Sequence, residues 1–293
     1  MNLENFYEKN YKKLMIISYL ILLVSLVFVI TNVIKTGYPF DRDISLKGGV
    51  SATIYKEDLN LDEIEDFLKQ NVNDFNVRRL TDSNTGKQTG LIIEVADINE
   101  QELKTLLAKK INIDYENKDE FDASATSEEF GRSFYQGLMI AILFAFVLMS
   151  IVVFISFRTF IPSIAVISAA LTDILASLVV INLLNIKLSA AGVVAFLLVI
   201  GYSIDTDILL TTRLLKRREE GNLYERLKHS ITTGLTMTIA AIAALTTGYF
   251  IAISEQLKQI FLVIIIALVF DIISTYFGNA GILIWYMKKK NIT

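Results

Sequence analysis

Four acidic residues lie within long apolar stretches of this sequence. Asp205 and Asp207 fall near the end of the apolar run that begins at Leu188, and Asp173 and Asp271 fall near the middle of two others. A carboxylate at the centre of a bilayer costs about 2.5 to 3.5 kcal/mol on insertion scales, so such residues usually mark a functional site. An acid shielded from water can take up and release protons near neutral pH when its surroundings change. These residues therefore predict proton-binding chemistry inside a membrane.

Asp205 and Asp207 are two positions apart, which places them about 200° apart around a helix of 3.6 residues per turn. One face of that helix would carry Gly201 and Asp205, and another would carry Ser203 and Asp207. The two acids cannot form one carboxylate pair while the helix stays regular. Because both faces offer polar neighbours, the spacing leaves open which acid is functional.

The composition around these acids indicates a membrane protein. Hydrophobic residues make up 53% of the chain, and its mean hydropathy is +0.49, both high for a soluble domain. Stretches of about 20 apolar residues can cross a bilayer as helices. Six such spans are predicted, at 14–34, 135–157, 160–185, 188–212, 231–254 and 257–287.

Charged residues predict the orientation of the spans. Clusters of Lys and Arg precede the first span, separate the second from the third and the fourth from the fifth, and follow the sixth. The positive-inside rule makes that side cytoplasmic, so a multi-pass protein of the cell membrane with both ends in the cytoplasm is expected. We expect three regions: a first helix with a cytoplasmic N-terminus at 1–35, an acidic extracytoplasmic domain at 36–132, and a five-helix bundle at 133–293. The bundle would contain a cytoplasmic loop at 213–230.

The extracytoplasmic segment alternates strand-like and helix-like hydrophobic periods. The predicted order is strand, helix, strand, turn, strand, helix and a weaker fourth strand, at 48–57, 59–70, 75–82, 83–90, 90–97, 99–111 and 113–121. This order is typical of an α+β ferredoxin-like fold. Ser127 then caps the start of a helix that leads into the second span.

Several chemistries are disfavoured by what the sequence lacks. It contains no cysteine, which excludes a disulfide framework, a thiolate nucleophile and a zinc-thiolate site. It contains no Walker-type phosphate loop, so energy would have to come from an ion gradient or a partner. We expect no catalytic residue, cofactor, metal or nucleic-acid partner.

The other polar residues of the spans have ordinary structural interpretations. Asp173 and Asp271 could be structural acids that bond to Ser, Thr or backbone groups of packed helices. His229, the only histidine, opens the fifth span, where an interfacial residue is more often solvated than part of a relay. Arg213 is most simply a topology signal. The small residues of the fifth span favour close helix packing.

The stretch GYSIDTDILLTTRLLK, which includes Gly201, Tyr202 and Ser203, resembles the fourth-helix signature of the SecD/SecF family of protein-export membrane proteins, in particular its SecF members. This family is part of the resistance-nodulation-division superfamily. The stretch DISLKGGVSATI, with Gly48 and Gly49, resembles the family's Gly-Gly strand, and ISFRTFIPSIAVISAALTDI resembles its second and third helices. One helix, an outside domain and five helices is also the family's order.

The resemblance implies an accessory subunit in the lipid bilayer that pairs with a SecD-like partner beside the Sec translocation channel. It also implies that proton movement is coupled to the passage of a translocating polypeptide. Bacterial SecF members have GYSIND here, which places their acid at Thr206, whereas SecD members place it at Asp205; the Asp-Thr-Asp form is similar to archaeal members. We therefore favour Asp205 over Asp207. Family members carry an arginine at the start of the fifth helix, and His229 occupies that position in this sequence.

Two other functions compete with export. Half of a small-molecule efflux transporter of the same superfamily would usually carry a much larger outside domain. An intramembrane aspartyl protease needs two converging acids, which Asp173 and Asp205 could supply, but the Gly-x-Gly-Asp motif of such proteases is absent.

Overall fold

The chain folds into two compact units in the computed structural model, which describes residues 3–82, 87–96 and 98–290. One unit combines Met1–Asp41 with Ile140–Thr293, and the other is Arg42–Met139. The first holds most of the long apolar helices and the second holds a β-sheet, so we describe them separately.

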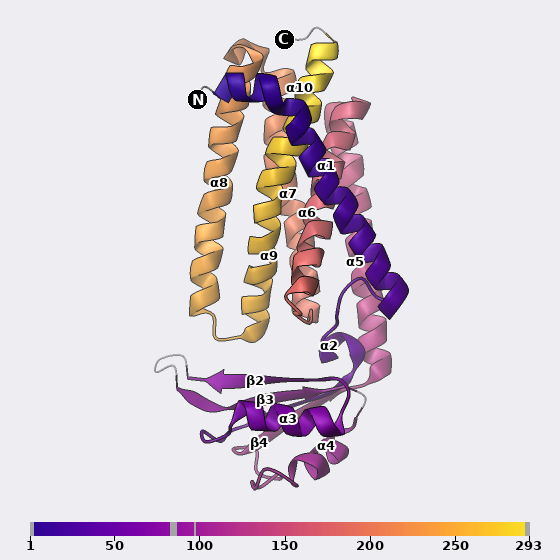
Figure 1. Cartoon of the computed structure of the whole chain (residues 1–293), viewed down its shortest axis with the longest axis vertical. Coiled ribbons are helices and arrows are strands. Elements are labelled where there is room, and N and C mark those ends of the chain that lie inside the picture. The colour runs from indigo at the N-terminus through magenta and orange to yellow at the C-terminus, as the bar shows by residue number, and fades with distance from the viewer. Residues whose placement is uncertain (1–2, 83–86, 97, 291–293) are drawn as a thin grey trace. The chain divides into compact units, whose positions relative to one another are not determined.

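Among the described residues, six helices are long and apolar enough to cross a membrane, which confirms the six predicted spans. The last span is continuous but divided into an α-helix, a π-helical segment and a second α-helix (Figure 1). The elements are α1 (Leu3–Thr36), α5 (Glu128–Phe157), α6 (Phe160–Leu183), α7 (Ala190–Lys216), α8 (Leu223–Ile251), α9 (Glu255–Ile273), η2 (Ser274–Asn279) and α10 (Ala280–Lys289).

Side-chain caps mark where several of these helices begin. The Ser189 hydroxyl accepts the Gly192 N–H before α7, and Asn222 forms a capping box with Glu225 before α8. Ser127 accepts the Phe130 N–H at 3.3 Å, which confirms the predicted cap at the start of α5. The N-terminal end of α1 and the C-terminal end of α10 lie at the same end of the helix bundle (Figure 1).

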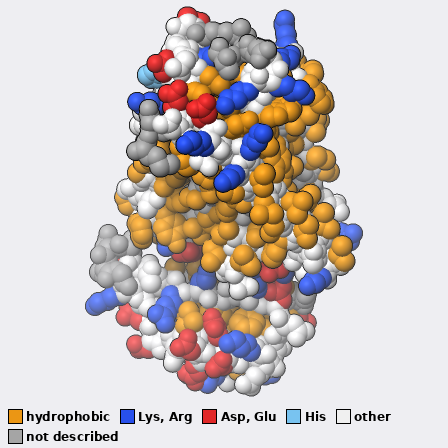
Figure 2. Space-filling model, turned by 45° about the horizontal axis from the view of Figure 1, so that its top comes forward, with side chains coloured by type: hydrophobic (Ala, Val, Ile, Leu, Met, Phe, Trp, Pro, Cys, Tyr) orange, Lys and Arg blue, Asp and Glu red, His pale blue; other side chains and the backbone are white. Residues whose placement is uncertain are grey.

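The spanning helices are unequally packed. In the most apolar window of each helix, 56% of the residues of α6 and 50% of those of α7 are buried, against 17% for α5 and 11% for α8. Hydrophobic side chains cover much of the outer surface of this unit on the face that Figure 2 shows. Thus α6, α7 and the last span form the centre, while α5 and α8 leave large apolar faces uncovered.

Glycines in the last span allow α1 to lie close against it. A Cβ added at Gly281 would lie 2.9 Å from Met15 Cβ and 3.0 Å from the Tyr11 carbonyl oxygen. Nearby, the Tyr7 hydroxyl donates to the Tyr276 carbonyl oxygen at 3.0 Å. The first helix is therefore held directly against the π-helical segment.

The second unit is built on a four-stranded antiparallel sheet with the strand order β2-β3-β1-β4. Its elements are α2 (Ile44–Lys47), β1 (Gly49–Ile54), α3 (Leu61–Asn71), β2 (Phe75–Thr81), β3 (Gln88–Val95), α4 (Glu100–Leu107) and β4 (Phe121–Thr126). One face of the sheet packs with α3 and α4 in a core that includes Ile54, Leu68, Ile93 and Leu103. Four residues of the predicted turn, 83–86, lie outside the described part of the chain.

The predicted position of the fourth strand is wrong. The strand is Phe121–Thr126 rather than 113–121, and it pairs with β1. The preceding segment instead forms turns, because Asp114 accepts the Glu116 N–H and Asn117 accepts the Asp119 N–H, each at 3.0 Å. Such local side-chain bonds compete with strand pairing.

Candidate functional site

Three of the four acids in the spans come together in the centre of the membrane-spanning unit. Asp173 on α6, Asp207 on α7 and Asp271 on α9 are each at most 1% exposed. In the described residues no Lys, Arg or His forms an ion pair with any of them. Buried charges are normally paired, so this cluster depends on hydrogen bonds instead.

Asp173 is bonded at both carboxylate oxygens. The Ser203 hydroxyl, from α7, lies 2.6 Å from Oδ2, and the Ser274 hydroxyl, from η2, lies 2.5 Å from Oδ1. Asp173 therefore ties α6 to both α7 and the last span.

Asp207 is bonded at only one oxygen. Its Oδ1 accepts from the Thr275 hydroxyl at 3.0 Å and from the Asn279 amide at 2.7 Å, and both donors belong to η2. Its Oδ2 is buried without a hydrogen-bond partner among the described residues. Buried polar atoms without a partner are uncommon in folded proteins and are often found at functional sites.

Asp271 contacts hydroxyl groups from two helices. The Thr206 hydroxyl lies 3.1 Å from each carboxylate oxygen, and the Thr275 hydroxyl lies 3.3 Å from Oδ1. Thr206 also reaches the Ser203 carbonyl oxygen, at 2.8 Å. Hydroxyls from α7 and η2 thus surround an acid on α9.

The π-helical segment supplies most of the donors. Ser274, Thr275 and Asn279 lie on η2, and the Ala280 N–H closes the wide turn by bonding to the Thr275 carbonyl oxygen. Single π-helical turns within α-helices are frequent at functional sites. None of these three residues is among the site residues predicted from the sequence. Their signal was a polar stripe at helical spacing from Asp271, at positions 274, 275 and 279.

Comparisons with known proteins identify the family. The family model described as "Protein export membrane protein SecD/SecF, C-terminal" matches residues 106–289. The protein-export membrane protein SecF of Methanolacinia petrolearia is 34% identical over 281 residues, which cover 95% of this chain and 94% of the relative. The SecF of Methanothermobacter thermautotrophicus is 34% identical over 291 residues, with 97% and 95% covered.

The chain belongs to the SecD/SecF family. This confirms the family that the sequence resembled. Among solved structures, SecDF from Thermus thermophilus, described as a translocon-associated membrane protein, superposes with a TM-score of 0.71 at 16% identity. The match covers 95% of this chain and 38% of the SecDF chain, so the SecDF fold is shared and this family member spans about two fifths of that polypeptide.

Other residues singled out in the sequence lie outside the acid cluster. Asp205 is exposed, on the side of α7 away from the three acids, and so is Gly201, where an added Cβ would meet nothing within 4 Å. The Tyr202 hydroxyl donates to the Met237 carbonyl oxygen on α8 at 3.1 Å. His229 is exposed near the start of α8. The Nε of Arg213 is buried, and no described residue forms a hydrogen bond with it.

The glycine pair has a structural explanation. Gly48 and Gly49 have φ angles of +91° and +136°. An added Cβ on Gly48 would lie 2.6 Å from Glu128 Cα, and one on Gly49 would lie 2.4 Å from the Val95 carbonyl oxygen. Only a glycine pair accommodates this path of the backbone.

Glu94 is a buried acid in the sheet unit. It is 6% exposed, pairs with Arg78 on β2 and accepts from the Asn76 amide at 3.2 Å. Burial raises the pKa of Glu94, with a contribution from the Asp43 carboxylate, and outweighs the opposing effects of Arg78 and Asn76. The carboxylate form is therefore disfavoured in the folded unit despite its cationic partner.

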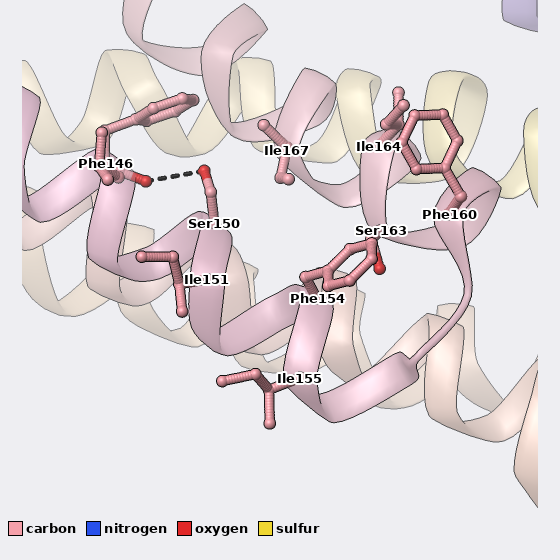
Figure 3. Close-up of a pocket in the computed structure, with 10 residues that line it drawn as sticks. Phe146, Ser150, Ile151, Phe154, Ile155, Phe160, Ser163, Ile164 and Ile167 are labelled. Atoms are coloured by element: carbon pink, nitrogen blue, oxygen red, sulfur yellow. Dashed lines mark hydrogen bonds between the residues drawn. The ribbon is translucent and has the colours of Figure 1, made fainter.

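A groove in the membrane-spanning unit differs chemically from the acid cluster. It lies between α5 and α6, has a volume of about 450 Å³ and is lined by Phe146, Phe154, Phe160, Ile164 and other apolar side chains (Figure 3). Ser150 turns its hydroxyl to the Phe146 carbonyl oxygen at 2.8 Å, which leaves the wall apolar. This groove suits hydrocarbon rather than an ion.

Within the described part of the chain, no group of three or more acidic, His or Cys residues is placed to hold a metal.

Proposed function

We propose that this protein is an accessory subunit of the Sec protein-export machinery, which pairs with a SecD-like membrane protein beside the translocation channel. Its relatives are protein-export membrane proteins, and a single SecDF chain contains this fold in 38% of its length. A SecD-like partner would correspond to part of the remaining length of that chain.

The exposed acid on α7 supports a membrane partner. Asp205 lies in a spanning helix, and a charged side chain that faces lipid at that position is costly. Gly201 on the same face is also open, and a small residue there lets another helix approach closely. We infer that this face of α7 contacts the partner, with Tyr202 beside it and Asp205 bonded across the interface.

We further propose that Asp173, Asp207 and Asp271 bind and release the protons that drive export, with Thr206 as a supporting donor. The observation that carries this is three buried carboxyl groups with hydroxyl and amide partners but no cation among the described residues. The free-energy cost of burying three negative charges together without a compensating cation would be prohibitive. The cluster must therefore hold protons in the arrangement described above. Asp205 and His229 would then act outside the cluster, where protons enter or leave.

The sheet unit would act on the exported chain. Its helices and strands follow the order β-α-β-β-α-β with the strand order β2-β3-β1-β4, which supports a ferredoxin-like extracytoplasmic domain. Such a domain, which lies between α1 and α5 in the sequence, is suited to contact polypeptide as it emerges on the outer side.

Export of a secreted reporter protein tests the proposal, in cells whose only copy is wild type, Asp207→Asn, Asp271→Asn or Asp205→Asn. The variants Asp207→Asn and Asp271→Asn should lose most of the dependence of export on the proton gradient while keeping normal abundance and partner recovery. Ser150→Ala, in the apolar groove, serves as a control from the same unit. Undiminished export in both cluster variants would refute the proton-coupled role.

A further inference from the structure

The Thr275 hydroxyl lies between two of the buried acids, Asp207 on α7 and Asp271 on α9. Its hydroxyl oxygen lies 3.0 Å from Asp207 Oδ1 and 3.3 Å from Asp271 Oδ1. A threonine hydroxyl has one hydrogen and two lone pairs. It can therefore donate to one carboxyl group while it accepts a proton from the other.

This hydroxyl departs from the bonding of other threonines in the same bundle. Thr232, Thr238 and Thr247 each donate to the backbone carbonyl oxygen four residues earlier. Such back-bonding is the usual choice of a helical threonine. Thr275 lies four residues after Asp271, and it bonds to the side chain of that residue. The segment η2 thus directs the Thr275 hydroxyl toward the acids.

The remaining partners fix the direction in which the network continues. Beyond Asp207, the Asn279 amide also approaches the Thr211 hydroxyl at 3.4 Å, toward the end of α7 that carries Arg213 and Lys216. On the other side, Asp271 connects through Thr206 and Ser203 to the neighbourhood of Asp173. Thr275 is the junction between these two parts.

The other ionisable groups at η2 are tyrosines. The Tyr7 hydroxyl, from α1, donates to the Tyr276 carbonyl oxygen at 3.0 Å. The Tyr276 hydroxyl is buried and has no hydrogen-bond partner within the described part of the chain. The acids that face η2 from α6, α7 and α9 are Asp173, Asp207 and Asp271. No described Lys, Arg or His forms an ion pair with these acids, so no cation competes for the hydroxyl.

We propose that Thr275 relays a proton between Asp271 and Asp207, an inference that rests on the proposed proton-coupled function. Protonated Asp271 gives its proton to the Thr275 oxygen, and Thr275 gives its own hydroxyl hydrogen to Asp207 Oδ1. Asp271 becomes a carboxylate, Asp207 becomes a carboxylic acid, and Thr275 is again a neutral hydroxyl with its hydrogen reversed. One proton moves from α9 to α7, and no other group changes charge.

Proton flux into liposomes tests the relay. The chain is purified with its co-purifying membrane partner, reconstituted with a pH-sensitive dye inside, and subjected to an imposed pH gradient. Thr275→Val keeps the shape but removes the hydroxyl, and should slow flux on the order of tenfold or more. Thr275→Ser restores the hydroxyl and should restore flux. Thr238→Val is the matched control, because Thr238 is equally buried and its hydroxyl donates to the Gly234 carbonyl oxygen rather than to an acid.

The outcomes separate the relay from the function on which it rests. Wild-type flux in Thr275→Val, together with lost flux in Asp207→Asn, would overturn the relay and leave the proton-coupled function standing. Unchanged flux and export in both Asp207→Asn and Asp271→Asn would overturn that function itself. Loss of flux in Thr275→Ser as well as in Thr275→Val, at normal partner recovery, would show that packing rather than the hydroxyl matters, and would also overturn the relay.

Discussion

Asp205 and Asp207 occupy opposite environments on α7, although a single residue separates them. Asp207 is fully buried and bonds to Thr275 and Asn279, whereas Asp205 is exposed on the other side of the helix. The helical repeat of 3.6 residues produces this separation, and the packing of the last span decides which of the two acids is enclosed. The two acids therefore have different surroundings: Asp207 belongs to the internal hydrogen-bond network, and Asp205 faces the surface of this unit.

Leucine substitutions should distinguish the buried Asp207 from the exposed Asp205. Asp207→Leu removes the nearest acceptor of the Thr275 hydroxyl and of the Asn279 amide and leaves each only a longer contact, to Asp271 at 3.3 Å and to Thr211 at 3.4 Å. The weakened bonding should cost about 1–3 kcal/mol and lower the unfolding midpoint of the purified chain. Asp205→Leu should leave that midpoint unchanged and reduce recovery of the membrane partner in pull-downs. A more stable Asp205→Leu chain with full partner recovery would mean that Asp205 faces lipid.

Gly281→Val should weaken the contact between α1 and α10. The new side chain would collide with Met15 and with the Tyr11 carbonyl oxygen, and overpacking of this kind costs about 1–3 kcal/mol. The expected result is a lower thermal unfolding midpoint in detergent. Gly137→Ala is the control, because an added Cβ there meets nothing within 4 Å. Equal midpoints for the two variants would contradict the close approach of the helices.

Gly49→Ala should destabilise the sheet unit strongly. Its φ of +136° is unfavourable for any residue with a side chain, and the Cβ would lie 2.4 Å from the Val95 carbonyl oxygen, where a backbone atom cannot yield easily. We expect faster amide hydrogen exchange in β1 and β3, corresponding to a loss of about 2 kcal/mol or more. Ser51→Ala, in the same strand, should change little, and similar exchange in both variants would count against this backbone path.

Glu94→Gln should alter how the stability of the sheet unit depends on pH. Burial raises the pKa of Glu94 above 4.5, so the folded unit holds this proton more tightly than the unfolded chain does. The resulting stabilisation is complete below about pH 4.5 and is lost as the pH rises through the raised pKa. The glutamine amide that replaces the carboxyl group cannot lose a proton, so the variant should gain stability relative to wild type as the pH increases.

Hydrogen exchange of the β3 amides in the full chain measures this effect, with variant and wild type compared at each pH between roughly 4 and 8. Glu57→Gln, at an exposed position, is the matched control and should follow wild type at every pH. A difference in stability between Glu94→Gln and wild type that stays constant across this pH range would mean that Glu94 has the same pKa in the folded unit and in the unfolded chain.

The local features of this protein follow from short stretches of its sequence. Apolar runs of sufficient length defined six spans, because a helix must be about 20 residues long to cross hydrocarbon. Hydrophobic periodicity located β1, α3, β2, β3 and α4, and the helical repeat separated Asp205 from Asp207. The motif around Gly201 and the order of the regions indicated the family. Each of these depends on residues that are near one another in the chain.

The composition of the site, in contrast, depends on contacts between segments that are distant in the chain. Asp173, Asp207 and Asp271 lie on three different helices, and no local sequence pattern indicates that their side chains converge. The wide turn of η2 adds Ser274, Thr275 and Asn279, whose hydrogen bonds to distant helices hold them in place. The fourth strand lies at Phe121–Thr126 rather than at the predicted 113–121, because its position depends on pairing with β1, which is a long-range contact. Burial and hydrogen bonding between distant segments select such features, and local sequence propensity does not specify them.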